Sequence, residues 1–471
     1  MGGTGMTKEE FKYAMQRGLG RCIVELKNTD DIEKYREIVL WGCSHEFGYD
    51  MLFDEERSYY FYQMIQLFKD TMPFLEEVSQ CLNENIPSDG MEFFLSVELL
   101  NFFYRKGNKI AFEKLQECYD KLLQILMEVG EGLENSFVQE RHHFEKLCIS
   151  LIYCRNSVED KDRAYLDIIE DIGKLIGKNS LFSSVMFECF QSECEKLIGK
   201  ERVEEIVREA AIYSVHVRNY IQSCEEEIQR KTMKDSSLVH TLPDTAEAIY
   251  YALKKEQQAG KWMSMPSLLL RRLQIKGLKQ EVQKFVDYYM LEKDEDMKSR
   301  MLCFFELEKC AGLLEARQLI KDSKTTSEAL REMALRVMGY VKSDMVHDYA
   351  IELIRNSSYK EEAISMLATN YRDADHDLLV SEVKSIPVSQ KEVKWFRVFQ
   401  NVMKIFRNKS VKNPPEELLL YMYETTLSTG SRKAYIEEMG EREMLTKEIL
   451  KECLYDSNAG IRNYAKRKLD M

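Results

Sequence analysis

Two stretches of this chain repeat one pattern: LREMALRVMGY at residues 330–340 and YKEEAISMLATNY at residues 359–371. At an offset of 29 residues a basic residue matches a basic residue, and three positions later Ala334 matches Ala363. A small residue such as Ala lets neighbouring helices approach closely. The period therefore predicts helix pairs that stack on one another, each packing mainly on its neighbours.

The same offset relates Asp344 to Asp373 and His347 to His376. An acidic residue at the start of a helix can accept a hydrogen bond from a free backbone N–H group. We therefore interpret each Asp and His pair as a helix cap and a first-turn residue with a structural role, and not as two metal sites.

A divergent third copy lies near the end of the chain, in DSNAGIRNYAKRKL at residues 456–469. There Arg462 precedes Ala465 by three positions, as Arg331 precedes Ala334. These segments resemble the second-helix signature of HEAT repeats, in which an acidic turn leads into a basic residue and a small Ala. The resemblance covers about residues 327–471 and implies an α-solenoid with a concave surface for a partner.

The rest of the sequence also predicts helices. Thr7 and Glu10 form a capping box, and apolar residues then recur every three or four positions as far as Leu26. The glycines of Arg17-Gly-Leu-Gly20 fall inside this helix, so they do not indicate a nucleotide-binding loop. With 7 Pro and 21 Gly in 471 residues, the chain is too poor in turn residues for an all-β protein. We expect an all-α fold of stacked helical hairpins.

The helical pattern weakens in KTMKDSSLVHTLPD at residues 231–244, which contains two adjacent Ser and a Pro. A boundary near Ser236 gives an acidic N-terminal all-helical domain, residues 1–235, and a HEAT-like helical repeat domain, residues 236–471. Up to residue 235 there are 29 Lys and Arg against 44 Asp and Glu, a net charge of −15. The total of −13 leaves +2 for the second domain.

Basic residues concentrate on a few predicted helices of the second domain. Residues 391–412, KEVKWFRVFQNVMKIFRNKSVK, contain seven basic residues and one acidic residue. This pattern is typical of the solvated face of a packed amphipathic helix, and it also fits contacts to phosphate or to an acidic partner. The candidate partner- or phosphate-binding residues are Lys394, Arg397, Lys404, Arg407, Arg271, Arg272, Arg462 and Arg467.

No catalytic motif stands out, and we predict no catalytic residue, no cofactor and no metal site. Glu140 and His143 have the spacing of a di-iron ligand pair, but the chain contains no second Glu-x-x-His. Cys43 and His45 are close in sequence, yet a cysteine hydrolase would also need a third positioned group and an oxyanion hole.

The sequence gives no sign of secretion or membrane insertion. Twelve Cys are scattered without a Cys-x-x-Cys pair, which is typical of a reducing compartment. The N-terminus lacks the basic and apolar regions of a secretory signal. The most apolar stretch, residues 91–104, is interrupted by Glu92 and Glu98. We expect a cytoplasmic protein that does not cross a membrane.

Two functional hypotheses remain open. The leading one is a non-catalytic helical-repeat scaffold that presents a concave surface to a protein partner. The rival is nucleic-acid binding through the C-terminal half, because HEAT-like solenoids are also the scaffold of DNA alkylation repair glycosylases. No residue-by-residue match to the active site of that family is present, and salt-dependent binding of duplex DNA would distinguish the two hypotheses.

Overall fold

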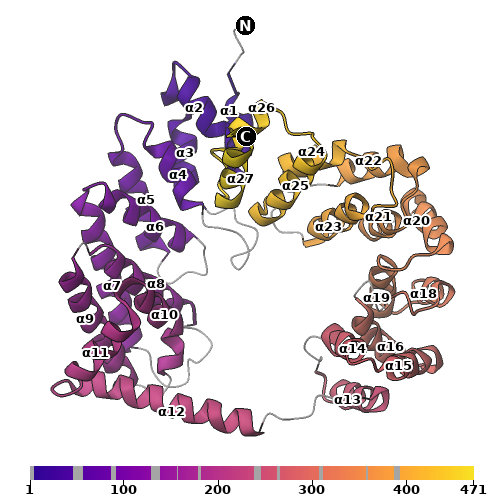
Figure 1. Cartoon of the computed structure of the whole chain (residues 1–471), viewed down its shortest axis with the longest axis horizontal. Coiled ribbons are helices and arrows are strands. Elements are labelled where there is room, and N and C mark those ends of the chain that lie inside the picture. The colour runs from indigo at the N-terminus through magenta and orange to yellow at the C-terminus, as the bar shows by residue number, and fades with distance from the viewer. Residues whose placement is uncertain are drawn as a thin grey trace. The chain divides into compact units, whose positions relative to one another are not determined.

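The structure is a computed structural model, and it describes residues 5–45, 57–85, 92–128, 138–155, 157–178, 182–237, 245–261, 266–306, 311–356, 359–386 and 393–470. Helices provide the secondary structure of these residues, which contain no strand (Figure 1). The prediction of an all-α fold is confirmed. None of the helices in these ranges combines the length and the apolar character that a membrane span requires.

The chain divides into two units, and the first of them contains both ends of the chain. This terminal unit comprises Met1–Ser236 and Thr426–Met471, and an inserted unit comprises Ser237–Thr425. The first division falls where the sequence pattern weakens. The second does not match the predicted repeat domain of residues 236–471, because the last three helices pack with the first ones.

The helices of the terminal unit pack mainly on their neighbours in sequence, for example α5 on α6, α6 on α7 and α7 on α8. Their bounds, with two short 3₁₀ helices, are α1 Lys8–Gln16, α2 Arg21–Asn28, η1 Ile32–Tyr35, α3 Arg36–Cys43, α4 Ser58–Ile65, α5 Met72–Glu84, α6 Glu92–Arg105, α7 Lys109–Glu128, α8 Val138–Tyr153, α9 Val158–Lys178, η2 Ser184–Phe187, α10 Glu188–Ile198, α11 Lys200–Ala210, α12 Val215–Ser237, α25 Thr429–Glu441, α26 Lys447–Cys453 and α27 Ala459–Leu469.

The inserted unit is built from shorter helices. Their bounds, again with two 3₁₀ helices, are α13 Ala246–Gln258, α14 Pro266–Ile275, α15 Lys279–Leu291, α16 Glu295–Leu302, η3 Cys303–Phe305, α18 Ala316–Asp322, α19 Glu328–Met338, α20 Asp344–Asn356, α21 Lys360–Thr369, η4 Asp373–Asp375, α22 His376–Ser385, α23 Val393–Arg407 and α24 Glu417–Thr425. Alternate helices pack directly: α16 contacts α19, α19 contacts α21, and α21 contacts α23. Figure 1 shows α19, α21 and α23 along one side of this unit and α18, α20 and α22 along the other.

The repeated histidines of the inserted unit connect successive turns. His347, at the start of α20, lies with Nε2 3.1 Å from both carboxylate oxygens of the buried Asp375. Asp375 also accepts the backbone N–H of Arg372 at 2.8 Å. One repeat later, His376 pairs in the same way with Glu417 at 2.9 Å. Each His therefore ties the start of its own helix to the start of the next helix but one, α22 for His347 and α24 for His376.

The prediction of one continuous helix through Gly18 and Gly20 is wrong, because the chain forms two helices there. The capping box is present, but α1 ends at Gln16 and α2 begins at Arg21. Gly18 has a φ of +68°, in the left-handed region that Gly adopts without strain. A Cβ atom at Gly20 would lie 2.0 Å from the carbonyl oxygen of Glu452. The two glycines thus let the C-terminal segment come against the turn between α1 and α2.

A fully buried arginine, Arg432 of α25, joins the two ends of the chain. Its Nε and Nη2 each donate to the carboxylate of Asp456 at 2.8 Å, and Nη2 also donates to the Ser457 hydroxyl at 3.0 Å. Its Nη1 donates to the carbonyl of Arg17. The backbone N–H of Ser457 donates to the carbonyl of Gly18 at 2.9 Å. The hydrogen bonds among Arg432, Asp456 and Ser457 near the C-terminus are therefore continuous with hydrogen bonds to the turn between α1 and α2.

Further contacts strengthen this connection. Arg57 is fully buried and donates from Nη2 to the carbonyl of Leu427 at 2.7 Å. On the surface of the same connection, Arg21 pairs with Glu452 at 3.0 Å. These interactions give the physical reason why residues 426–471 belong to the terminal unit.

We predict that Asp456→Asn lowers the free energy of unfolding of the terminal unit by about 3–5 kcal/mol, because it leaves the buried Arg432 guanidinium without its counter-charge. Equilibrium urea unfolding measures the change. The control is Asp470→Asn, at an exposed residue beside the same α27 helix, which should leave the transition in place. Equal transitions for the two variants would contradict the role of this ion pair.

Gly20→Ala should also destabilise the terminal unit, by about 1–3 kcal/mol, since the new methyl group meets a backbone carbonyl that cannot rotate away. Gly312→Ala is the matched control, because a Cβ atom at Gly312 meets no atom within 4 Å. Thermal melting of the two variants tests the difference. Equal melting temperatures for Gly20→Ala and Gly312→Ala would show that the turn accommodates a methyl group at residue 20 without a clash.

Candidate partner-binding groove

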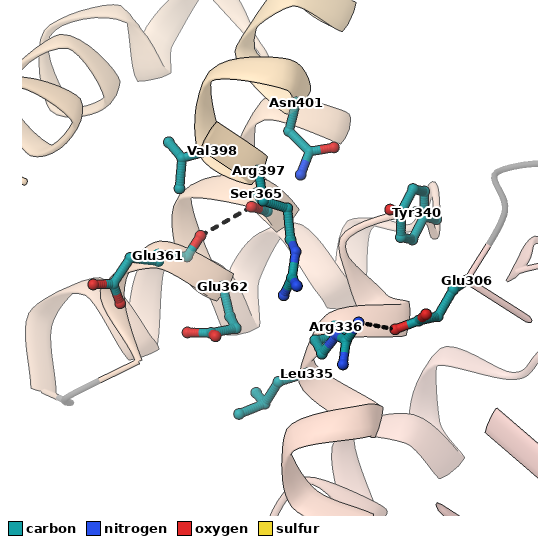
Figure 2. A pocket seen from close by; sticks show the side chains of 10 residues that line it. All are labelled: Glu306, Leu335, Arg336, Tyr340, Glu361, Glu362, Ser365, Arg397, Val398 and Asn401. Carbon is teal, nitrogen blue, oxygen red and sulfur yellow. Dashed lines mark hydrogen bonds and ion pairs between the residues drawn. The ribbon is translucent and has the colours of Figure 1, made fainter. Parts of the chain in front are cut away.

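A first pocket of about 70 Å³ lies between α19, α21 and α23 of the inserted unit (Figure 2). Two arginines, three glutamates and a tyrosine account for most of its polar lining. The lining residues are Glu306, Leu335, Arg336, Tyr340, Glu361, Glu362, Ser365, Arg397, Val398 and Asn401.

A second pocket of about 440 Å³ lies further along the same three segments. Its lining contains three cationic side chains and no carboxylate. The lining residues are Lys342, Ala368, Thr369, Tyr371, Lys404, Ile405, Arg407, Asn408 and Val411.

The two pockets follow one another along each helix in the same direction. On α23, Arg397 lines the first pocket and Lys404 lines the second, seven residues or about 10 Å further along the axis. On α21, Ser365 and Thr369 have the same order. The Lys404 ammonium lies 4.2 Å from the centroid of the Tyr340 ring, where the pockets meet. We call the two pockets together the groove.

The charges of the first pocket are only partly neutralised within the protein. Arg336 pairs with Glu306 at 2.5 Å. Among the described residues, the side chains of Arg397, Glu361 and Glu362 have no hydrogen-bond or ion-pair partner. Figure 2 shows Arg397 reaching from α23 toward Arg336, with Glu361 and Glu362 on the side of Arg397 away from Tyr340. A ligand would thus meet charges of both signs that are available for new contacts.

Tyr340 keeps a neutral hydroxyl group at the junction of the pockets. Burial raises its pKa, the nearby carboxylate of Glu306 adds to this effect, and the cations of Arg397 and Arg336 oppose it. A neutral phenol can both donate and accept a hydrogen bond at neutral pH.

The second pocket presents cations beside fixed hydroxyl groups. Lys342 and Arg407 are exposed, and neither has an acidic partner among the described residues. Tyr371 donates its hydroxyl to the carbonyl of Asn413 at 2.9 Å, and burial with nearby carboxylates raises its pKa to about 12. Thr369 donates to a backbone carbonyl at 2.5 Å. Positive charge therefore dominates the lining of this pocket.

Three of the eight predicted binding residues lie in the groove: Arg397, Lys404 and Arg407. The side chain of Lys394 lies outside the described part of the chain. Arg271 and Arg272 are on α14, which packs against α15 and η3, and they line neither pocket.

The other two predicted residues belong to the terminal unit. Arg462 donates from Nη1 to the carbonyls of Asp456 and Ser457, at 2.7 Å each, and its guanidinium lies 5.0 Å from the centroid of the Tyr59 ring. Arg462 is thus used inside the fold. Arg467 is exposed in the last turn of α27.

The remaining groove residues were not among those predicted from the sequence, although the sequence contains a signal for them. The two repeated stretches supply most of them, and positions 29 apart line the groove together. These matched positions are Arg336 with Ser365, Tyr340 with Thr369, and Lys342 with Tyr371. An alignment of the two repeated stretches at this offset therefore predicts that these residues lie on the same face of the stacked helices.

The surroundings of Cys43, His45 and His143, the other residues considered for catalysis or metal binding, are those of residues packed within the fold. Burial raises the pKa of the Cys43 thiol well above its usual range, and His45 Nδ1 lies 2.7 Å from the Trp41 carbonyl. The His143 ring is buried and stacks on Phe93, with 3.9 Å between the ring centroids. The side chain of Glu140 lies outside the described residues. Within the described ranges, no group of three or more His, Cys, Asp or Glu residues is placed to hold a metal ion.

A comparison of the sequence with models of known protein families finds no match. A search of curated proteins finds no similar sequence.

If Arg397 contributes nothing to the fold, Arg397→Gln should change the free energy of unfolding by less than about 0.5 kcal/mol, as surface substitutions do. Arg432→Gln, which removes a paired and fully buried guanidinium, should destabilise the protein by several kcal/mol in the same urea titration. A large loss of stability in Arg397→Gln would mean that the groove is a structural element and would argue against a binding role.

Proposed function

We propose that this protein is a non-catalytic, HEAT-like helical-repeat scaffold, and that the groove of its inserted unit binds an extended segment of a protein partner. The direct packing of alternate helices α16, α19, α21 and α23 supports the repeat architecture. So do the hydrogen bonds of His347 and His376, which recur at the repeat offset and join one turn to the next.

The observation that carries the proposal is the set of unpaired charges in the groove. Arg397, Glu361 and Glu362 line a pocket of the protein, yet they make no ion pair among the described residues. By comparison, the buried Lys298 and Asp322 of the same unit pair with each other at 2.7 Å. Charges that the fold does not use, at a concave site between helices, are suited to contacts with a partner.

The charge pattern favours a protein over a nucleic acid. A DNA strand carries one phosphate per ~3.4 Å, so about three phosphates would pass along the ~10 Å between the pockets. At least one phosphate would then approach Glu361 and Glu362, where like charges repel. A peptide can vary its charge from residue to residue, and its backbone can bond to Arg397 and Asn401 between the two ends.

Affinity capture from native cells with the full chain tests the proposal. We expect that Arg397→Glu combined with Lys404→Glu reduces the captured partner at least tenfold. The matched control combines Lys321→Glu with Lys384→Glu, at exposed residues on α18 and α22, and should retain the partner. Titration of the purified partner against both variants then confirms direct binding. Equal capture by both variants would rule out the groove as the binding site.

The nucleic-acid hypothesis predicts a different result. At ~50 mM salt, where phosphate contacts are strongest, the protein should shift duplex DNA, and replacement of Lys394, Arg397, Lys404 and Arg407 by Glu should abolish the shift. We expect no shift with the unmodified protein. A shift that disappears in this variant would assign the groove to nucleic acid.

A further inference from the structure

The first pocket of the groove is lined in part by polar side chains that have no hydrogen-bond partner among the described residues. We propose that this pocket binds a Lys or Arg residue of an extended peptide, whose side chain pairs with Glu361 and Glu362. A nearby peptide group of the same ligand bonds to Asn401. This inference rests on the function proposed above, since it names the chemistry that the groove recognises in its partner.

Asn401 of α23 is a buried amide without a partner. Only 3% of the residue is exposed, and its side chain has no hydrogen bond to any described residue. Two other described asparagines are buried to a similar extent, and the fold uses both. Asn101 donates to the Ser150 hydroxyl at 3.0 Å. Asn458 accepts the backbone N–H of Ile461 at 3.1 Å. A buried amide without hydrogen bonds is costly, and a ligand in the pocket can supply them.

The surroundings of Asn401 suit a peptide group. An Asn side chain offers two N–H donors and a carbonyl acceptor, so it can bond both the C=O and the N–H of one residue. In an extended chain these two groups of a residue point to the same side. The hydroxyl of Tyr340 also lacks a hydrogen-bond partner among the described residues, and Figure 2 shows the Asn401 amide between Arg397 and Tyr340. A peptide backbone here meets groups that can both donate and accept.

Arg397 indicates the path of the backbone. It lies four residues before Asn401 on α23, so the two side chains share a face and are about 6 Å apart along the axis. An extended peptide advances ~3.3 Å per residue, and every second residue directs its backbone groups to the same side. A peptide that runs along α23 therefore places carbonyl groups two residues apart at Arg397 and Asn401. The guanidinium can donate to the first of these carbonyls.

Glu361 and Glu362 give the pocket its charge preference. Both are in the first turn of α21, are partly exposed and have no ion-pair partner among the described residues. Arg336 and Glu306 neutralise each other. The described lining then retains two anions and one cation, Arg397. A ligand side chain that reaches the two glutamates is attracted if it is basic and repelled if it is acidic.

Neighbouring charges do not reverse this preference. The ammonium of Lys404 lies 4.2 Å from the centroid of the Tyr340 ring. Figure 2 shows Tyr340 and the two glutamates on opposite sides of Arg397. Beside the glutamates on α21, the ammonium of Lys360 is paired with Glu382 at 2.9 Å. The positive end of the α21 dipole contributes about +0.5 of an elementary charge, which is less than the charge of the two carboxylates.

Peptide libraries with the full chain as bait test the charge preference. Nine-residue peptides carry Arg, Lys, Ala or Asp at the central position and random residues elsewhere. We expect the Arg and Lys libraries to be retained at least tenfold better than the Ala library, and the Asp library no better than the Ala library. Spermidine, a cation without peptide groups, should not displace the selected peptides at a tenfold excess.

Charge reversal at the glutamates tests which residues contact the basic side chain. Glu361→Lys with Glu362→Lys should change the preferred central residue from Arg or Lys to Asp. The control is Glu247→Lys with Glu352→Lys, at exposed residues of α13 and α20, and it should keep the preference of the unmodified protein. Loss of folding cannot produce a change of preference.

Ester substitution tests the role of Asn401. In a selected peptide each backbone amide is replaced in turn by an ester, which removes one N–H donor. We expect one ester, about two residues from the basic residue, to weaken binding about three- to tenfold, as the loss of one neutral hydrogen bond does. With Asn401→Leu, this ester and the parent peptide should bind within about twofold of each other.

Urea unfolding separates this role from a structural one. Replacement of an unpaired buried amide by a Leu of similar size should leave the midpoint of unfolding unchanged or raise it. Asn101→Leu, which removes a paired amide, should lower the midpoint. If Asn401→Leu lowers the midpoint as much as Asn101→Leu does, the amide serves the fold and the inference is wrong.

Four binding results would also overturn the inference. They are equal retention of the Arg and Ala libraries, an unchanged preference in the Glu361 and Glu362 variant, the same ester sensitivity in Asn401→Leu, and displacement by spermidine, which would assign the pocket to a free polyamine. If partner capture still depends on Arg397 and Lys404 while the central residue of the peptide has no effect, the scaffold function stands and only the specificity for a basic residue fails.

Discussion

The buried ion pair between Arg432 and Asp456 is the interaction on which the terminal unit depends. A fully desolvated guanidinium costs several kcal/mol unless its donors are satisfied, and this one has a carboxylate, a hydroxyl and a backbone carbonyl as partners. Because the carbonyl belongs to Arg17, the pair is satisfied only when the first and last helices are in contact. Burial of the Arg432 guanidinium is therefore compensated only when the N-terminal and C-terminal segments of the terminal unit are packed together.

Two pairs of arginines in this protein differ in what their guanidinium groups contact. Arg57 and Arg432 are enclosed and donate to carbonyl or carboxylate oxygens, so their positions follow from packing. Arg397 and Arg407 lie at a pocket and make no such bonds among the residues described. The positive charges of Arg397 and Arg407 are therefore available to a ligand.

Features that depend on nearby residues were predictable from sequence, and features that depend on distant ones were not. The helical fold and the capping box of Thr7 follow from local spacing. The break at Gly18 and Gly20 depends on a segment more than 400 residues away, which no local pattern reveals. Arg462 looked like a surface cation because its partners are carbonyl oxygens, which every residue has. The groove could be predicted only from the 29-residue offset, which matches Tyr340 with Thr369.

The division of the terminal unit affects how the protein is made. Between Ser236 and Thr426 the ribosome must add about 190 residues before the helices that cover α1 and α2 exist. At 5–20 residues per second this takes roughly 10–40 s, far longer than the collapse of a chain of this size. During that interval the turn at Gly18 is without its C-terminal partner, so the nascent protein passes through a stage in which chaperones have the opportunity to bind it.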